Sequence, residues 1–488
     1  MSLMWDIIES NKRKSLIIFF LMGIFFLVLG YFAGSALVKG GGIYGIFAAS
    51  FIWLILSLIS FFQGDSLILA VSKAKLVTHD LHPQLFNVVE EMKIAANLPA
   101  MPKVYIIPEH APNAFAVGRS PDKSAVVVTA GLLERLNRDE LQGVIAHEMS
   151  HILNRDVLLL TFAGILMGSI VILSEVFLRG MFFSRGSSRR YRSGLGGGQA
   201  QIIIMVIALV LAILAPIIAR LFYFAISRKR EYLADASGAR LTRYPEGLAS
   251  ALEKISSGSE ELPEANKVTA PMYIINPLKA KKVSFSSLSS THPPTQERIR
   301  ILRSMSGGVN FQNYNQAFLK VKGSSVGVLP KSVADDEEAI LARTASKESR
   351  PSKGKKAGAR DLGDLIRVLN GYVFITCACG LKIKVPKDYK NPSIKCPRCG
   401  RQNTVPLEGL IAASAMLNQA AGAGSKGGEP PQKEQPASDS PQVYTKKGSG
   451  WETFNCRCGR LINLSPSFQG NHVTCSKCGK VINITRNN

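Results

Sequence analysis

The sequence predicts a mainly α membrane protein with transmembrane helices, a cytoplasmic α+β domain, and two small four-cysteine modules on flexible linkers. Two observations predict this fold class. Four long apolar runs lie before residue 230, whereas the last third of the chain is polar and rich in Lys, Gly, Pro and Ser. All eight cysteines follow residue 376, in two clusters of four, which argues against a disulfide-stapled secreted fold and favours a reducing compartment.

The 488 residues are too many for one compact core, so several modules are expected. In chain order they are an N-terminal transmembrane hairpin (1–62), the first part of the α+β domain (63–156), a second transmembrane or membrane-associated hairpin (157–226), the second part of the α+β domain (227–320), a linker (321–370), a first cysteine module (371–406), a second linker (407–450) and a second cysteine module (451–488). The formal charge of +24 suggests anionic lipid or nucleic acid as neighbours. We favour the simpler interpretation that a membrane protein carries Lys and Arg on its cytoplasmic side.

The first two apolar runs, Ser15–Leu37 and Ile43–Phe62, are each long enough to cross a bilayer core of about 30 Å as a helix. The basic stretch Lys12–Lys14 precedes the first run, which places the N-terminus in the cytoplasm. A cleaved signal peptide is disfavoured, because the first run is too long for one and a second run follows at once.

The third and fourth apolar runs, Val157–Leu178 and Gln201–Ile226, contain residues that are unusual in a membrane span. For Glu175 we favour a position at the interface, whereas for Arg220 a functional and an interfacial position are equally open. The loop between the two runs carries five arginines, which breaks the positive-inside trend. Either this loop is translocated, or the two runs form a hairpin that does not fully cross the membrane. In both alternatives residue 227 lies on the same side of the membrane as residues 63–156.

The segment Asp139–His151 is predicted to be a helix, with Asn137 as its N-cap. His147 and His151 are four residues apart, so both rings leave the same helix face and can bind one tetrahedral Zn²⁺. Glu148 is rotated off that face far enough to hold a water molecule rather than the metal. The H-E-x-x-H spacing therefore predicts a catalytic zinc site.

A catalytic zinc needs a third protein ligand and an open position. The segment Arg228–Asp235 continues the fourth apolar run as a helix, and Glu231 and Asp235 share one of its faces. Glu231 is the candidate ligand, and Asp235 is expected to accept a hydrogen bond from the ring of a ligand histidine.

The segment H-E-M-S-H, followed about 80 residues later by E-Y-L-A-D with an apolar hairpin between them, resembles the HtpX family of membrane-bound zinc peptidases. These are gluzincins related to the eukaryotic prenyl-protein peptidase, and the resemblance covers roughly residues 1–305. It implies a gluzincin-type peptidase domain in which His147, His151 and Glu231 bind the catalytic Zn²⁺ and Glu148 is the general base.

Two shorter segments extend the resemblance. His292 and Arg298, in H-P-P-T-Q-E-R, resemble an element of the family in which both side chains stabilise the oxyanion. The other segment resembles the family's substrate-binding edge strand, whose exposed amides would pair with an extended substrate; it comprises Asn113, Ala114, Phe115 and Ala116. The histidines without a motif are interpreted as structural or solvated; they are His79, His82, His110 and His472.

The resemblance implies an endopeptidase that cleaves membrane or unfolded proteins at the cytoplasmic face of a bacterial-type inner membrane, in protein quality control. The protein would be multi-pass, with its active site and C-terminus in the cytoplasm and the lipid bilayer as a neighbour. A prenyl-protein-type peptidase and a non-catalytic, membrane-tethered zinc-ribbon adaptor are the alternatives. The intact set of His147, Glu148, His151 and Glu231 argues against the adaptor.

The two cysteine clusters have the same spacing, offset by 79 residues, and so form an internal repeat. In each, a C-x-C pair and a C-x-x-C pair lie sixteen residues apart, and each pair is followed directly by Gly, as a tight knuckle requires. Two such knuckles predict a four-cysteine zinc ribbon of two short hairpins, and hence two structural Zn²⁺ besides the catalytic one. For the ribbons we favour protein or substrate recruitment, with nucleic acid as the alternative partner. The expected ligands are Cys377, Cys379, Cys396, Cys399, Cys456, Cys458, Cys475 and Cys478.

Overall fold

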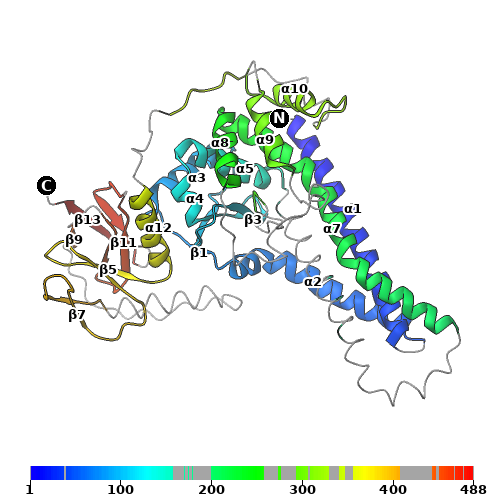
Figure 1. Ribbon diagram of the computed structural model, residues 1–488, viewed down its shortest axis with the longest axis horizontal. Coiled ribbons are helices and arrows are strands. Elements are labelled where there is room, and N and C mark those ends of the chain that lie inside the picture. Colours follow the sequence, from blue (N-terminus) through cyan, green and yellow to red (C-terminus); the bar gives the residue numbers. More distant parts are fainter. Residues whose placement is uncertain are drawn as a thin grey trace, which may run out of the picture.

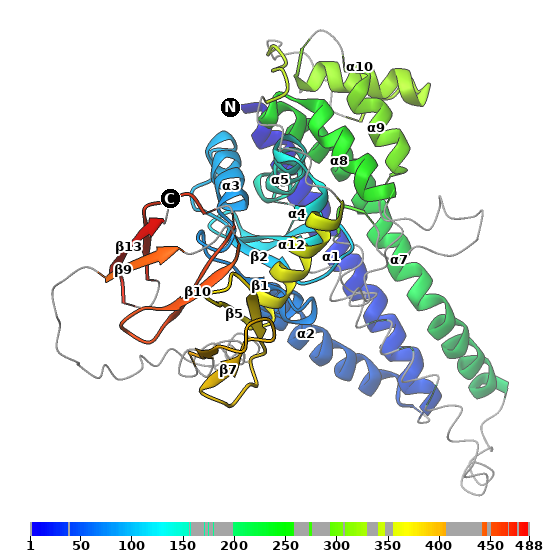
Figure 2. The same ribbon diagram turned by 60° about the vertical axis from the view of Figure 1, so that its left-hand side comes forward.

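The computed structural model describes residues 2–37, 40–155, 157, 170, 174, 179, 199–257, 273–275, 293–305, 308–328, 340–346, 355–406, 442–446, 450–466, 468–475 and 478–486. His292, Glu175, most of the third apolar run and most of the arginine-rich loop lie outside these residues. Figures 1 and 2 show three long helices that project from one side of an α+β body, with the cysteine modules on the opposite side.

Helices α1 (Ser2–Leu37) and α2 (Gly42–Val71) contain the first two apolar runs and form the N-terminal hairpin. Within it, Phe19–Ala36 and the whole of α2 are long and apolar enough to cross a membrane. The two helices approach closely through small residues, since a Cβ at Gly30 would lie 2.6 Å from the carbonyl oxygen of Gly45. The hairpin is therefore a tightly packed unit.

Helix α7 (Gln199–Thr242) contains the fourth apolar run and continues without a break into the α+β domain. It lies beside α1 in both views (Figures 1 and 2), and its Ala215 packs in one cluster with Met22 and Phe26 of α1. Its described apolar stretch, Ile203–Ala215, is shorter than the two candidate spans. A single helix thus connects the hairpin to the part of the chain that carries Glu231.

A four-stranded sheet in the order β1–β2–β4–β3 forms one layer of the α+β domain. β2 and β4 are parallel, whereas β3 is antiparallel to β4 and forms an edge of the sheet. Both faces are buried, because Val126 and Val128 pack in the main core while Val127 packs with Ile68 of α2 on the other face. The strands are β1 (Lys75–Leu76), β2 (Lys103–Ile107), β3 (Ala114–Ser120) and β4 (Lys123–Thr129).

Helix α5 lies at the centre of the domain, with the sheet on one side and α7 and α8 on the other. Nearly every residue from Leu141 to Ile152 is buried. His82 caps α3, because its Nδ1 accepts the amide of Leu85 at 3.2 Å, so this histidine has the structural role expected of it. The helices of the domain are α3 (Pro83–Ala95), α4 (Ala130–Arg135), α5 (Arg138–Leu153), α8 (Pro245–Ser257), α9 (Thr295–Arg303) and α10 (Phe311–Lys322).

The C-terminal third consists of a helix and short hairpins. The hairpins β5–β6 and β7–β8 form the first cysteine module, and β10–β11 and β12–β13 form the second. Strand β9 adds to the second module by pairing in parallel with β13. The elements are α12 (Lys355–Leu369), β5 (Val373–Thr376), β6 (Lys382–Val385), β7 (Ser393–Lys395), β8 (Gln402–Thr404), β9 (Gln442–Lys446), β10 (Glu452–Asn455), β11 (Leu461–Leu464), β12 (His472–Thr474) and β13 (Val481–Arg486).

The first expected linker, 321–370, differs from the expectation of a flexible tether, whereas most of the second, 407–450, lies outside the described residues. The first contains α12, whose Leu362, Leu365 and Val368 are buried in the main core of the α+β domain. Trp451 joins the same core, and the two modules meet where the amide of Phe374 lies 3.4 Å from Thr453 Oγ1. The linker composition is rich in Lys, Gly and Ala, but the apolar residues of α12 recur at helical spacing, and their burial docks the modules onto the domain.

Candidate functional site

Helix α5 begins with a reciprocal capping box at Asn137, the residue that the sequence predicts as its N-cap. Asn137 Oδ1 accepts the amide of Glu140 at 2.9 Å, and Glu140 Oε2 accepts the amide of Asn137 at 2.8 Å. Glu140 also accepts from Ser250 Oγ at 2.6 Å and Lys254 Nζ at 2.7 Å, both on α8. The start of the helix is therefore fixed two turns before its histidines.

The structure brings the two histidines of α5 together with Glu231 of α7. The rings of His147 and His151 are 4.9 Å apart and perpendicular. The Nε2 atom of His147 lies 3.7 Å from Glu231 Oε2, and that of His151 lies 3.4 Å from Glu231 Oε1. All three side chains are buried, and their ligand atoms lie within 4.8 Å of one another. Both imidazoles thus present the same nitrogen to one carboxylate.

These distances fit a metal shell. For tetrahedral Zn²⁺ with bonds of about 2.0–2.1 Å, neighbouring ligand atoms are about 3.3 Å apart. The two Nε2-to-carboxylate distances, 3.4 and 3.7 Å, are close to that edge length. A donor set of two imidazoles and one carboxylate is also the set that catalytic zinc favours, because it leaves one position free.

Helix α7 approaches α5 closely because a glycine stands at the crossing. A Cβ at Gly238 would lie 3.1 Å from the backbone nitrogen of His147 and 3.2 Å from its Cα. Any larger residue at 238 would push against the backbone of α5, and the neighbouring backbone would have to shift by a few tenths of an ångström. This crossing sets the separation of Glu231 from the two histidines.

A buried ionic layer lies behind the three candidate ligands. His147 Nδ1 is 3.0 Å from Asp235 Oδ1, which is the contact expected of Asp235. Arg298 of α9 donates to both oxygens of that carboxylate, from Nε at 2.8 Å and from Nη2 at 2.7 Å. Burial by itself raises the pKa of Asp235, but Arg298 outweighs it and holds that pKa below its ordinary value. Asp235 therefore stays ionised and fixes the ring of His147.

The structure gives Arg298 partners that differ from the expected one. Its guanidinium is fully buried and, besides Asp235, contacts the carbonyl oxygen of Ile274 at 3.2 Å and Glu231 Oε2 at 3.3 Å. Its Nη2 also lies 3.5 Å from His147 Nε2, so the guanidinium stands beside both a candidate ligand histidine and Glu231. The expected companion, His292, lies outside the described residues.

Glu148 lies next to His147 on α5 and is 2% exposed. Burial raises its pKa, and the neighbouring imidazoles of His147 and His151 oppose that shift. Glu148 thus lies near enough to both histidines for their charges to act on it.

The expected substrate-binding segment lies on the edge strand β3, but it is not exposed. Asn113, Ala114 and Phe115 are between 1% and 3% exposed, and Ala116 is 6% exposed. The carbonyl of Ala114 already accepts the amide of Ile274 at 2.9 Å. The segment 273–275 thus covers the strand edge at Ala114, and the amides of Asn113 and Ala114 donate to Thr129 Oγ1 and Asn113 Oδ1, which corrects the expectation of free amides along the whole segment.

Sequence reasoning missed a second network beside the site. The hydroxyl of Tyr232, next to Glu231, donates to Glu297 of α9, and Glu297 also pairs with Lys322 Nζ at 2.8 Å. Burial chiefly raises the pKa of Tyr232, so it is a neutral donor. The pairing joins α7, α9 and α10, and the position of Glu297 next to Arg298 is the one signal in the sequence that indicates it.

Each cysteine module brings four sulfur atoms together. In the first, Cys377 and Cys399 Sγ are 3.5 Å apart and Cys379 and Cys396 Sγ are 3.6 Å apart. The second repeats this crosswise pattern at 3.7 and 3.5 Å, in the pairs Cys456–Cys478 and Cys458–Cys475. Four thiolates around Zn²⁺ with bonds of about 2.3 Å would be about 3.8 Å apart, so both clusters fit a metal.

The knuckle glycines have the conformation that their positions require. Gly380, Gly400, Gly459 and Gly479 have φ between 68° and 80°. Each donates its amide to the carbonyl of the first cysteine of its pair, as in Gly380 to Cys377 at 2.8 Å. The repeat predicted from the spacing is thus also a repeat of backbone geometry.

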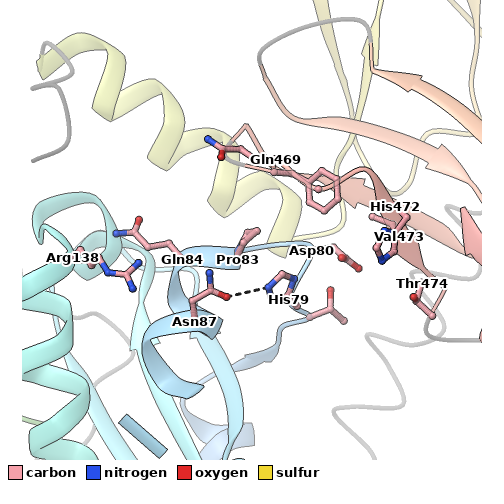
Figure 3. A pocket seen from close by; sticks show the side chains of 13 residues that line it. His79, Asp80, Pro83, Gln84, Asn87, Arg138, Gln469, His472, Val473 and Thr474 are labelled. Carbon is pink, nitrogen blue, oxygen red and sulfur yellow. Dashed lines mark hydrogen bonds between the residues drawn. The ribbon is translucent and has the colours of Figure 1, made fainter. Parts of the chain in front are cut away.

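A cleft of about 770 Å³ separates the start of α3 from the second module (Figure 3). Its walls carry His79, whose Nε2 lies 3.2 Å from Asn87 Oδ1, and His472 on the module side. None of the three candidate ligands lines it. The cleft is therefore a junction between the domain and the module, and not the metal site.

Comparisons with known proteins agree with the site. Residues 80–306 match the sequence model of peptidase family M48. The chain is 47% identical over 303 residues to a protease HtpX homolog of Dictyoglomus turgidum, which covers 62% of this chain and 94% of that protein. It is 43% identical over 308 residues to a protease HtpX homolog of Listeria monocytogenes, which covers 62% of this chain and 100% of that protein.

Among solved structures, Ste24p of S. mikatae is 19% identical, with a TM-score of 0.29 over 60% of this chain and 65% of that chain, which is too small a likeness for the two folds to be compared. The two protease relatives determine the family of this chain, because the sequence identity of 47% and 43% extends over nearly the whole length of each relative. The chain belongs to peptidase family M48, among the HtpX-type membrane-bound zinc metalloproteases.

Proposed function

We propose that the catalytic Zn²⁺ is held by His147, His151 and Glu231, and that the substrates are membrane or unfolded proteins. One observation supports the assignment above the others: two Nε2 atoms and a carboxylate meet in a buried site within 4.8 Å. When bound there, Zn²⁺ supplies Lewis acidity, which lowers the pKa of a bound water to about 7. Three protein ligands leave the fourth position for water or substrate.

Glu148 is the general base of this proposal. It takes the proton of the attacking water and passes it to the leaving amine, which its place beside His147 on α5 supports. Asp235 fixes the His147 tautomer whose Nε2 is free for the metal, and Arg298 positions both Asp235 and Glu231. His292 keeps the oxyanion role that the family resemblance implies.

The substrate is proposed to pair with β3 as an extended strand. The Asn113 carbonyl accepts the amide of Thr129 on β4, whereas the Ala114 carbonyl faces the opposite side of the strand. Because residues alternate along a strand, the backbone of Ala116 faces the same outer side as Ala114. Pairing would therefore begin at Ala116, and recognition through backbone groups selects unfolded segments over a particular side-chain sequence.

The site is proposed to face the cytoplasm from a multi-pass protein in a bacterial-type inner membrane. Support comes from the basic stretch before the first span and from the short connection, Ser72–Ala74, between α2 and β1. A cysteine introduced at Ser187, treated with a membrane-impermeant thiol reagent in intact cells, tests the topology. Labelling of this position indicates a translocated loop, and labelling of a cysteine introduced at the exposed Glu90 of α3 would refute the cytoplasmic assignment.

The cysteine modules, at 371–406 and 451–488, are proposed to bind one structural Zn²⁺ each and to recruit polypeptide substrates. Elemental analysis of the purified chain should then give three zinc ions. The variants Cys396→Ser, Cys475→Ser and His151→Ala should each lose one. An unchanged count in Cys396→Ser would contradict the structural site of the first module.

Casein digestion by the purified full-length protein tests the catalytic assignment. Glu148→Gln keeps the shape of the side chain but removes the base, so hydrolysis should fall by at least roughly 100-fold. Glu90→Gln, at an exposed position on α3, is the matched control and should keep full activity. Equal hydrolysis by the native, Glu148→Gln and chelator-treated proteins would refute the proposed mechanism. A prenyl-protein substrate is a second candidate that none of the described contacts favours.

A further inference from the structure

The segment 340–346 follows the family match, which ends at residue 306, and lies in the stretch whose composition indicates a linker. It is held to the α+β domain at its start, where the amide of Val309 donates to the carbonyl of Ile340 at 2.7 Å. From there it reaches the last turn of α7 and the first turn of α5. These are the two helices that carry all three candidate zinc ligands.

At the α7 end, Arg343 binds the terminal carbonyls of the helix. Its amide donates to the carbonyl of Arg243 at 2.9 Å, and its Nε donates to the carbonyl of Thr242 at 3.0 Å. The guanidinium also lies over the ring of Tyr244, 4.8 Å from the centroid. The last carbonyls of a helix lack partners within the helix and carry partial negative charge, so a cation here stabilises the end of α7.

At the α5 end, the same guanidinium binds the first turn. Nη2 of Arg343 lies 2.8 Å from Asp139 Oδ1 and 2.7 Å from Gln142 Oε1. Ser346 completes the contact, because its amide and hydroxyl donate to Asp139 Oδ2 at 2.8 and 2.9 Å. Burial alone would raise the pKa of Asp139, but Ser346 and Arg343 outweigh it and hold that pKa below its ordinary value.

We propose that Arg343 is a positioning residue for the zinc site, which braces α5 against α7 from the C-terminal extension. This inference rests on the proposed function, in which the two helices supply the ligands. One side chain connects the two helices directly, so the angle between them cannot change without breaking its contacts.

A small change in the angle between α5 and α7 moves Glu231 further than it moves the end of α7 that Arg343 binds. The helices cross at Gly238, and Thr242 lies four residues beyond the crossing, or about 6 Å along the axis. Glu231 lies seven residues to the other side, or about 10.5 Å. A rotation that moves Thr242 by about 0.5 Å therefore moves Glu231 by about 0.9 Å in the opposite direction. Displacements of that size are large against the tolerance of a catalytic geometry.

The test compares Arg343→Ala, Arg343→Lys and the matched control Arg303→Ala in the full-length protein. Arg303 pairs with Glu246 and Glu253 and so joins α9 to α8. We measure kcat and KM for a fluorogenic peptide, and the rate at which a chelator removes zinc. In the time course of zinc removal, the phase that belongs to the catalytic ion is the one that is missing in His151→Ala.

For Arg343→Ala we expect a fall in kcat of about three- to tenfold with KM changed less than twofold, and a similar rise in the rate of zinc release. Arg343→Lys, which keeps the charge but not the forked contacts, should lie between it and the native protein. Arg303→Ala should match the native protein in all three readings. If Arg343→Ala does not fold, Arg343→Lys and Ser346→Ala take its place in the test. Each should then show a smaller fall in kcat and a smaller rise in the rate of zinc release.

Native kcat and zinc release in Arg343→Ala would overturn the proposal, as would a lowered Tm with both readings unchanged, since that marks a structural role alone. Failure of the proposed function is distinguishable from this outcome. In that case the zinc phase would persist in His151→Ala, whatever the residue at 343.

Discussion

Replacement of Asp235 by Asn should weaken both the zinc site and the fold. The carboxylate accepts hydrogen bonds from Nε and Nη2 of Arg298 at 2.8 and 2.7 Å, and its Oδ1 lies 3.0 Å from Nδ1 of His147. An asparagine offers one acceptor oxygen and an NH₂ group that would face a donor. Since Asp235 and Arg298 are both fully buried, the change removes the carboxylate that binds the guanidinium through both oxygens and leaves Glu231 as its remaining carboxylate partner, which costs about 3–5 kcal/mol.

That loss corresponds to a fall in Tm of about 6–20 °C for a domain of this size. Loss of a carboxylate that orients a ligand histidine should weaken zinc binding by roughly 10- to 100-fold. Thermal unfolding at saturating zinc measures the first effect, and competition with a chromophoric chelator measures the second. Asp122→Asn, at an exposed turn between β3 and β4, is the matched control. Zinc affinity within twofold of native, together with an unchanged Tm, would show that the buried ionic layer has no role in the site.

Three further changes test other parts of the structure. Gly143→Ala would place its Cβ 2.6 Å from the backbone nitrogen of Leu248, so α8 must shift. The unfolding free energy should therefore fall by about 1–3 kcal/mol in thermal melts, and an unchanged Tm would contradict the close packing. The folded pKa of Asp139 is depressed, so its stabilising contribution is complete above the ordinary value of 3.8 and is lost as the pH falls through the folded pKa. The difference in Tm between native and Asp139→Asn should therefore shrink below about pH 4, and a constant difference down to pH 2 would contradict it. Leu365→Asp puts a charge on the buried face of α12, so limited proteolysis should release the C-terminal third, whereas native rates of cleavage would show that α12 does not hold it.

Local spacing was sufficient to predict the part of the site that lies on single helices. His147 and His151 share a face because they are four residues apart, and Asn137 with Glu140 forms a cap that depends only on neighbouring backbone. The glycine after each cysteine pair likewise has the positive φ that a knuckle needs, a property of the turn itself. In each case the determining interactions span only a few residues, so the sequence pattern contains them.

Features that depend on contacts between distant segments were beyond such reasoning. The sequence pattern around Arg298 did not indicate that it binds Asp235, 63 residues earlier, and the carbonyl of Ile274. The same carbonyl-bearing segment covers the edge of β3 at Ala114. The composition of 321–370 indicates a linker, although α12 is docked by its buried leucines. No local pattern specifies the partner of a buried face or a buried charge.

The charges of the site supply a physical reason for its metal that is independent of the ligand distances. Glu148, Glu231 and Asp235 are between 0% and 4% exposed, and the buried guanidinium of Arg298 contacts Glu231 and Asp235. With neutral imidazoles, the carboxylates of Glu231 and Asp235 exceed the single charge of the guanidinium that they contact, in a region where isolated charges cost several kcal/mol each. A divalent cation at the three-ligand cluster offsets that excess. The α5–α7 pair cannot reach this balance until α9 brings Arg298, so assembly of the metal centre and closure of the domain are expected to be one cooperative event.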